Sequence, residues 1–210
     1  MNQKNNKNSL GLDNCFEDLN NPIDLFSKWF DKAKKSEIND PNAVALGTVN
    51  TNHQPSVRMV LLKGLSNDGF VFYTNFNSKK GNDLKNNKFA SMCFHWKTLR
   101  RQVRIVGEVK KVSDKESDEY YNSRAYGSRI SAWASSQSEP MDNRGIFLKK
   151  IEEFKKKYPN ELNVPRPPHW AGWRLHPTQI EFWVDGENRI HERLNYVKEN
   201  KKWIKKILYP

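Results

Sequence analysis

The sequence has little cysteine and no long apolar segment. Its 210 residues include two cysteines, Cys15 and Cys93, too few for a disulfide framework or a cysteine-based zinc site. No apolar run approaches the roughly 18 residues of a membrane-spanning helix, and the start of the chain, rich in Asn and Lys, lacks the apolar core of a signal peptide. We therefore expect a cytoplasmic protein with no membrane association.

Common nucleotide-binding and metal-binding motifs are also missing. Neither a GxGxxG turn nor a P-loop occurs, which argues against the dinucleotide-binding and P-loop folds. His53, His95, His169 and His176 have neither the spacing of metal ligands nor that of a catalytic triad. We expect these histidines to be structural, and no metal to be bound.

The chain is instead rich in positive charge and in aromatic side chains. Its formal net charge is +12, and 12% of its residues are aromatic. This charge favours an anionic partner, which could be nucleic acid, an acidic membrane surface or a phosphorylated small molecule. A basic nucleic-acid-binding protein is therefore one class to consider, although the sequence contains no RNP-like motif.

Hydrophobic periodicity predicts a mainly β chain with peripheral helices. Strands are expected at 43–49, 56–63, 70–74, 89–96, 102–112, 170–175, 178–184, 189–197 and 203–209. Helices are expected at 22–35, shortly after 78, at 113–123, at 128–136 and from 142 to 158. Because turns join most of the first five strands, the pattern favours an antiparallel barrel or sandwich. Residues 1–20 are polar and weakly patterned, so we expect a flexible arm before a single domain at 21–210.

The segment at 180–193 carries a row of basic residues. Asp185 and Gly186 predict a hairpin turn after an aromatic strand. Arg189, His191 and Arg193 would then share one face of the return strand, with successive members roughly 6 to 7 Å apart. Such a face requires solvent, acidic partners or a bound anion.

Two further groups of residues could bind anions. Arg58 and Lys63 lie at the two ends of an apolar strand and point to opposite faces, so they either reach solvent or serve two neighbouring anion sites. Ser78, Lys79 and Lys80 stand at a predicted helix start, where free backbone N–H groups can cradle a phosphate.

Tyr120, Arg124 and Ser128 recur at every fourth position. They would lie on one face of a helix that continued that far. Gly127 leaves that continuation open.

Together, these features occur in an order that resembles a known family. The features are residues 58–63, Tyr73 with Thr74, residues 78–80, Arg101 with Gln102, Tyr120 with Arg124 and Ser128, Gln137 with Ser138, and Glu181 to Arg193. Over residues 22–210 the chain resembles the pyridoxine/pyridoxamine 5′-phosphate oxidases. The resemblance implies an antiparallel split β-barrel that binds FMN, and a homodimer with two active sites at the subunit interface. It also implies oxidation of pyridoxamine 5′-phosphate and pyridoxine 5′-phosphate by O2 to pyridoxal 5′-phosphate and H2O2, with no nucleic acid as partner.

The resemblance also implies roles for individual residues. The FMN-binding set is Arg58, Met59, Val60, Leu61, Leu62, Lys63, Tyr73, Thr74, Lys79, Lys80, Gln102, Gln137, Ser138, Trp183 and Arg193. The substrate-binding set is Lys63, Tyr120, Arg124, Ser128, Arg189, Ile190 and His191, and the catalytic set is Arg189, His191 and Asp40. On this assignment Arg58 and Lys63 serve two phosphates, that of the cofactor and that of the substrate.

Three departures from the family pattern stand out. Lys79 occupies a position where the family often has Arg, and Glu192 one where Asp is common. The basic N-terminal segment that often covers the substrate has no clear counterpart at 9–20. A flavoenzyme with the same barrel but another substrate is therefore an alternative.

Overall fold

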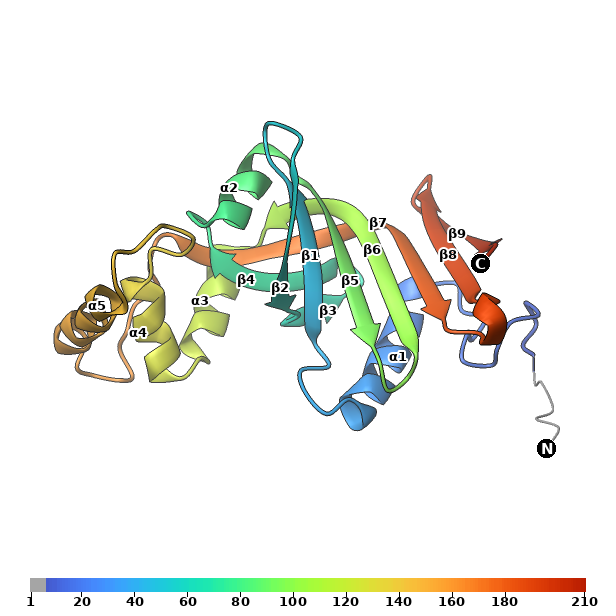
Figure 1. The fold of residues 1–210 in the computed structure, drawn as a ribbon, viewed down its shortest axis with the longest axis horizontal. Helices are drawn as coiled ribbons and strands as arrows, with labels where there is room; N and C mark the ends of the chain where they lie inside the picture. Colours follow the sequence, from blue (N-terminus) through green and yellow to red (C-terminus); the bar gives the residue numbers. More distant parts are fainter. Residues whose placement is uncertain (1–6) are drawn as a thin grey trace.

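A computed structural model describes residues 7–210, and one strongly curled antiparallel sheet dominates it (Figure 1). The strands are β1 (Ala43–Val49), β2 (Pro55–Leu61), β3 (Gly64–Ser66), β4 (Gly69–Asn75), β5 (Phe89–Trp96), β6 (Arg101–Lys111), β7 (Trp170–Val184), β8 (Glu192–Glu199) and β9 (Lys202–Leu208). Their order is β2-β1-β5-β6-β7-β4-β3, with β8 and β9 added beside β7. The prediction of an antiparallel, mainly β chain with peripheral helices is confirmed.

Five helices accompany the sheet over the described range, and sequence signals account for most of their starts. They are α1 (Pro22–Ser36), α2 (Lys79–Asn86), α3 (Asp114–Asn122), α4 (Tyr126–Ala134) and α5 (Arg144–Lys157). The side chains of Asn21, Ser78 and Ser113 accept hydrogen bonds from N–H groups in the first turns of α1, α2 and α3. None of these helices is long and apolar enough to cross a membrane.

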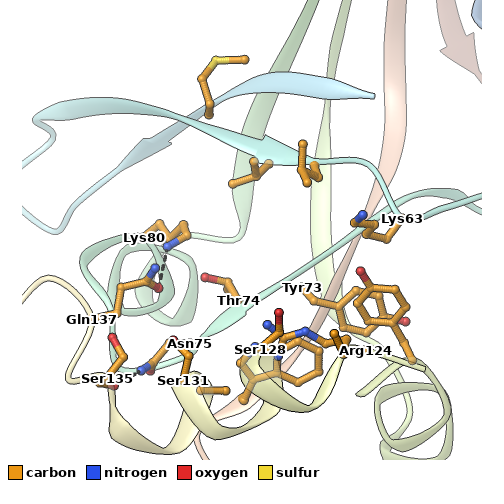
Figure 2. A pocket seen from close by; sticks show the side chains of 17 residues that line it. Lys63, Tyr73, Thr74, Asn75, Lys80, Arg124, Ser128, Ser131, Ser135 and Gln137 are labelled. Carbon is orange, nitrogen blue, oxygen red and sulfur yellow. Dashed lines mark hydrogen bonds between the residues drawn. The ribbon is translucent and has the colours of Figure 1, made fainter. Parts of the chain in front are cut away.

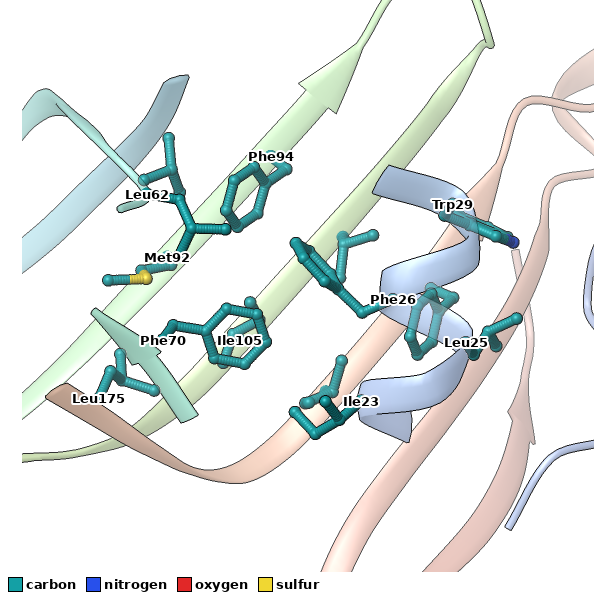
Figure 3. Close-up of a cluster of buried hydrophobic side chains, with 14 of the residues drawn as sticks. Ile23, Leu25, Phe26, Trp29, Leu62, Phe70, Met92, Phe94, Ile105 and Leu175 are labelled. Carbon is teal, nitrogen blue, oxygen red and sulfur yellow. The ribbon is translucent and has the colours of Figure 1, made fainter. Parts of the chain in front are cut away.

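Helix α1 supplies a large part of the hydrophobic core, as Figure 3 shows. The ring of Phe26 lies 4.9 Å from that of Phe70 and 5.0 Å from that of Phe94, centroid to centroid. Trp29 is almost fully buried and meets Phe182 of β7 edge-on. Burying each such side chain contributes about 1.5 to 3 kcal/mol, so α1 closes one side of the curled sheet.

One long strand, β7, connects the two ends of the molecule. The sequence predicts separate strands at 170–175 and 178–184, but Trp170–Val184 is continuous. Pro177, which lacks an N–H group, lies opposite a register shift between Val106 and Gly107. A Cβ atom on Gly107 would come within 2.1 Å of the His176 carbonyl oxygen. The bulge therefore carries the strand past a proline that would otherwise end it.

The predicted hairpin at 180–193 is wrong in its second half. Strand β8 begins at Glu192, and a short 3-10 turn (Glu187–Arg189) precedes it. Asn188 and Arg189 have φ values of 52° and 63°, in the left-handed region, so the chain loops here instead of pairing. Arg189, His191 and Arg193 therefore do not share a strand face, because only Arg193 lies on a strand.

Only part of the flexible arm expected at 1–20 can be compared with the structure, because residues 1–6 lie outside the described residues. Within residues 7–20, Phe16 is fully buried and its ring lies 5.4 Å from that of Trp29. The indole Nε1 of Trp29 donates a 2.7 Å hydrogen bond to the Cys15 carbonyl oxygen. Leu12, Cys15 and Phe16 are thus part of the core, which the polar composition of the segment concealed.

Candidate functional site

A cavity of about 530 Å³ opens between β2, β4 and the helices α3 and α4 (Figure 2). The predicted site residues that line it are Met59, Val60, Leu61, Lys63, Tyr73, Thr74, Lys80, Tyr120, Arg124, Ser128 and Gln137. Residues that the resemblance assigns to FMN and to the substrate, from distant parts of the chain, therefore line one cavity.

One corner of the cavity is cationic and lies at the start of α2. Lys80 Nζ donates to Gln137 Oε1 at 3.0 Å and to Ser78 Oγ at 3.2 Å. Burial, together with the nearby Arg58 guanidinium, lowers the pKa of Lys80 to about 8. Thr74 Oγ1 is buried and finds no hydrogen-bond partner within residues 7–210. An anionic group bound here would offset the repulsion between Lys80 and Arg58 and accept a hydrogen bond from the Thr74 hydroxyl.

Arg58 lies beside this corner, held by neighbouring strands. Its guanidinium donates to Thr48 Oγ1 at 2.6 Å, Ser56 Oγ at 2.7 Å and the Leu46 carbonyl oxygen at 3.1 Å. The buried carboxylate of Asp83 is 3.8 Å away.

Lys79 lies 3.6 Å from the same Asp83 carboxylate. Its side chain is more than half exposed. Its contribution to an anion site therefore comes from the rim and is screened by solvent.

A second cationic corner lies at the other side of the cavity, where Figure 2 shows Lys63 and Arg124. Tyr120 is on α3 and Ser128 on α4, while Arg124 lies in the connection between these helices. The sequence left open whether one helix continues across these residues, and the structure shows that it does not, since α3 ends at Asn122 and α4 begins at Tyr126. The break nevertheless keeps all of them on one cavity wall.

Arg124 is the most constrained residue of the second corner. Its guanidinium carbon lies 4.8 Å from the centre of the Trp170 ring. Burial lowers its pKa from the ordinary value, and its Nη1 is buried with no hydrogen-bond partner in the part of the chain that the structure describes. An unsatisfied guanidinium that opens on a cavity is suited to paired contacts with a phosphate.

A stack of aromatic rings supports this corner. Tyr73 and Tyr120 lie 4.0 Å apart, centroid to centroid, with planes 17° apart, and Trp170 lies 5.3 Å from Tyr73 at 8°. Sequence reasoning missed Trp170 as a cavity residue, and also missed Asn75, Ala125, Ser131, Ala132 and Ser135. These residues carry no motif, and they come together through long-range contacts such as the hydrogen bond that Asn75 Nδ2 donates to the Ser135 carbonyl oxygen.

Another set of predicted residues lies at the C-terminal end of β7, the end that pairs with β8 (Figure 1). Gln102, Trp183 and Arg193 stand opposite one another on β6, β7 and β8, so their side chains share one sheet face. Trp170 and Trp183 are 13 residues apart on β7 (183 − 170), which is on the order of 40 Å of strand. The predicted site residues are thus divided between the two ends of β7.

The loop after β7 holds the remaining predicted residues of that end. The His191 ring lies 4.6 Å from that of Trp183, and its Nδ1 is 3.2 Å from Asp185 Oδ1. Arg189 and Ile190 are exposed. We call Gln102, Trp183, Arg189, His191 and Arg193 the distal cluster.

Three other predicted residues lie apart from the cavity, its first cationic corner and the loop after β7. Leu62 is buried in the hydrophobic core. Ser138 lines a neighbouring groove beside α5. Asp40 is exposed before β1, with a φ of 40°, and is not among the described residues that line the cavity.

The outer face of the sheet bears exposed apolar side chains next to the cavity. Val57 and Met59 on β2 are 70% and 62% exposed, and Phe89 on β5 is 65% exposed. Met59 also lines the cavity. The apolar face therefore continues into the candidate site, as expected if a partner covers both.

Two family models match most of the chain. The model described as pyridoxamine 5′-phosphate oxidase matches residues 30–158. A second, described as the pyridoxine 5′-phosphate oxidase C-terminal dimerisation region, matches residues 170–210.

Curated relatives match over nearly the full length. A protein of Pelagibacter ubique named pyridoxine/pyridoxamine 5′-phosphate oxidase is 63% identical over 207 residues, which are 98% of this chain and 100% of the relative. A protein of the same name from Allorhizobium ampelinum is 52% identical over 93% of this chain and 95% of the relative.

Solved structures share the fold. The crystal structure of PhzG from Burkholderia lata in complex with tetrahydrophenazine-1-carboxylic acid has a TM-score of 0.87 at 27% identity, covering 93% of this chain and 96% of that one. A pyridoxamine 5′-phosphate oxidase-related, FMN binding protein from Nostoc punctiforme has a TM-score of 0.71 at 17% identity, covering 88% and 95%. The predicted split barrel is confirmed.

Proposed function

Since the chain belongs to the pyridoxine/pyridoxamine 5′-phosphate oxidase family, we propose that it oxidises pyridoxamine 5′-phosphate and pyridoxine 5′-phosphate to pyridoxal 5′-phosphate. FMN is the proposed cofactor and O2 the electron acceptor, with H2O2 as the second product. The proposed setting is the cytoplasm, in keeping with the free thiols of Cys15 and Cys93.

The residues at the start of α2 fit the phosphate of FMN. The buried Lys80 ammonium and the unpartnered Thr74 hydroxyl are available to an anion, and Arg58 lies beside them. In this proposal Arg58, Lys79, Lys80 and Thr74 hold the phosphate. Bound FMN would supply the redox chemistry, taking two electrons from the substrate and passing them to O2.

The second corner fits the substrate phosphate. Arg124 offers an unsatisfied Nη1, and Lys63, Tyr120 and Ser128 line the same wall. Two positive groups and two hydroxyls are suited to a phosphate dianion. Their task is to bind and orient the substrate, so that its reactive carbon faces the cofactor.

A homodimer completes the proposed site. The distal cluster lies too far along β7 to join the cavity of its own chain, so we assign it to the cavity of the partner. The match of residues 170–210 to a dimerisation region and the exposed apolar face next to the cavity support this arrangement. Trp183 and Arg193 would then contact the partner's FMN, while Arg189 and His191 would orient the substrate ring and assist proton movement. The role of Asp40 stays a prediction from the resemblance.

The single observation that carries the proposal is the pair of separate cationic corners in one cavity, one for each phosphate. An oxidase of the same barrel with an unphosphorylated substrate would need only the first corner. A nucleic-acid-binding protein would need neither enclosed corner, since it binds along an open basic surface.

An absorption experiment tests the proposal. The purified protein is saturated with FMN, freed of excess, and mixed with pyridoxamine 5′-phosphate in the absence of oxygen. We expect the visible flavin absorption to fall, and to return when air is admitted. Protein that cannot retain FMN, or retained FMN that the substrate does not reduce, would contradict the proposal.

A further inference from the structure

His191 in the distal cluster has one close carboxylate neighbour. Nδ1 of His191 is 3.2 Å from Asp185 Oδ1. The His191 side chain is 23% exposed and that of Asp185 is 33% exposed, so solvent screens this contact only in part. The ring also packs against Trp183, with centroids 4.6 Å apart. Two neighbours therefore fix the ring, one by charge and one by packing.

Asp185 is itself held by Arg100, from the turn between β5 and β6. Nε and Nη2 of Arg100 donate to Asp185 Oδ2 at 2.9 and 2.6 Å, and the backbone N–H of Asp185 donates to the Arg100 carbonyl oxygen at 3.0 Å. The hydrogen bonds from the Arg100 side chain lower the pKa of the Asp185 carboxyl. One carboxylate oxygen is thus taken by Arg100, and the other is left to face His191.

The other acidic residues of the loop are directed elsewhere. The carboxylate of Glu192 pairs with Lys7 and accepts from the backbone N–H of Asp13. Glu187 is exposed, and its side chain has no hydrogen-bond or ion-pair partner in the described part of the chain. Asp185 is therefore the carboxylate in position to act on His191.

Nδ1 of His191 has two alternative partners. The backbone N–H of Gly186 donates to it at 3.2 Å, which requires that Nδ1 carry no proton. When Nδ1 carries a proton, it donates to Asp185 Oδ1 instead. Both partners belong to the loop that follows β7, so the ring has a hydrogen bond in either state and its Nε2 keeps one direction.

We propose that Asp185, clamped by Arg100, is a positioning residue for His191. It holds the imidazole through Nδ1 and leaves Nε2 free to face the substrate in the partner's cavity. This inference rests on the proposed function, in which His191 contacts the substrate ring. Asp185 is expected to touch neither the substrate nor FMN.

The test compares Asp185→Asn with Glu187→Gln, which removes the same charge from the same loop without a contact to His191. Arg100→Gln is a third variant, in which the carboxylate remains but its clamp is lost. For each FMN-loaded variant, kcat, KM and the FMN dissociation constant are measured. In parallel, proton NMR at acidic pH follows the downfield signal of a His Nδ1–H bonded to a carboxylate, assigned by its loss in His191→Asn.

We expect Asp185→Asn to lower kcat about tenfold, with KM and FMN affinity within about twofold of wild type. Arg100→Gln should lower kcat less, and Glu187→Gln should match wild type. The downfield signal should disappear in Asp185→Asn and persist in Glu187→Gln.

Two results would overturn the inference. One is an Asp185→Asn protein that keeps both kcat and the downfield signal. The other is a loss of FMN affinity that parallels the loss of kcat, because that would mark a structural role. Absence of turnover in the wild type would instead refute the proposed function, and the NMR signal would still report on the contact between Asp185 and His191.

Discussion

Lys80 donates a 3.0 Å hydrogen bond to Gln137, a residue 57 positions later in the chain. The bond ties the start of α2 to the segment that follows α4, and so fixes one corner of the cavity. Because Lys80 is buried beside Arg58, its pKa is lowered to about 8, and its charge is therefore lost at moderately alkaline pH.

This lowered pKa predicts a pH-dependent affinity for FMN. A bound phosphate dianion stabilises the ammonium of Lys80, so binding raises the pKa of Lys80 and takes up a proton above about pH 8. Affinity should be highest between about pH 6, where the phosphate becomes a dianion, and about pH 8. It should then fall by up to about tenfold per pH unit, as measured by quenching of flavin fluorescence.

Lys80→Arg is the control, because arginine keeps its charge throughout this range. The alkaline fall should flatten in this variant, even if its affinity at neutral pH is lower. An alkaline fall of equal steepness in Lys80→Arg would show that another group controls FMN binding.

Arg124→Ala should weaken substrate binding and spare the cofactor. A charge-assisted hydrogen bond contributes about 1.5 to 3 kcal/mol, so kcat/KM for pyridoxamine 5′-phosphate should fall about 10- to 100-fold. The FMN dissociation constant should change less than about threefold. Arg144→Ala, at an exposed arginine on α5, is the matched control and should leave both values unchanged. A joint loss of FMN and substrate binding in Arg124→Ala would mean that the two corners are not independent.

Mixed dimers test whether the distal cluster serves the partner. Arg124→Ala and Arg189→Ala dimers should each be nearly inactive. Random exchange makes half of the dimers mixed, and each mixed dimer has one intact site, so about a quarter of wild-type activity should return. Separate affinity tags allow the mixed dimers to be isolated and assayed.

The same mixture of variants also tests the alternative, in which the distal cluster and the cavity of one chain form a single site. If both groups of residues served a cavity in one chain, every site would carry a substitution, and activity would not return on mixing. Mixing either variant with itself is the control for the exchange procedure.

Phe16→Ala should destabilise the fold. The ring is fully buried against Trp29, and removing a buried Phe side chain typically costs about 3 to 5 kcal/mol. We expect the free energy of unfolding in urea to fall by about 3 kcal/mol. Asn14→Ala, at an exposed position nearby, should change it by less than about 0.5 kcal/mol. Equal stabilities of the two variants would mean that residues 7–20 are not anchored in solution.

Local signals in the sequence predicted much of this fold. Asn21 and Ser113 cap the helices expected at 22–35 and 113–123, and such caps depend on residues within one turn. The helical spacing of the aromatic residues in α1 likewise indicates the face that the helix buries. Local patterns drew attention to Lys63 and Lys80, but Thr74 and Gln137 were named only through the resemblance, since no local pattern links Lys80 to Gln137.

The errors have a common physical origin in long-range contacts. The hairpin predicted at 180–193 is wrong in its second half, where the chain forms a longer loop, and Asp185 in that loop pairs with Arg100 of another turn, a contact that no local turn rule includes. The burial of Phe16 depends on Trp29 and was hidden by polar neighbours. Trp170 reaches the cavity because it pairs with Asn75 of β4, a residue far away in the sequence.

Oxygen consumption by the FMN-loaded protein tests the central claim most directly. The rate is measured with pyridoxamine 5′-phosphate and with pyridoxamine, which lacks the phosphate, and pyridoxal 5′-phosphate is quantified in the same samples. We predict oxygen uptake with matching product formation for the phosphorylated substrate, and a kcat/KM at least about a hundredfold lower without the phosphate. No uptake with the phosphorylated substrate, or equal rates with both substrates, would contradict the account.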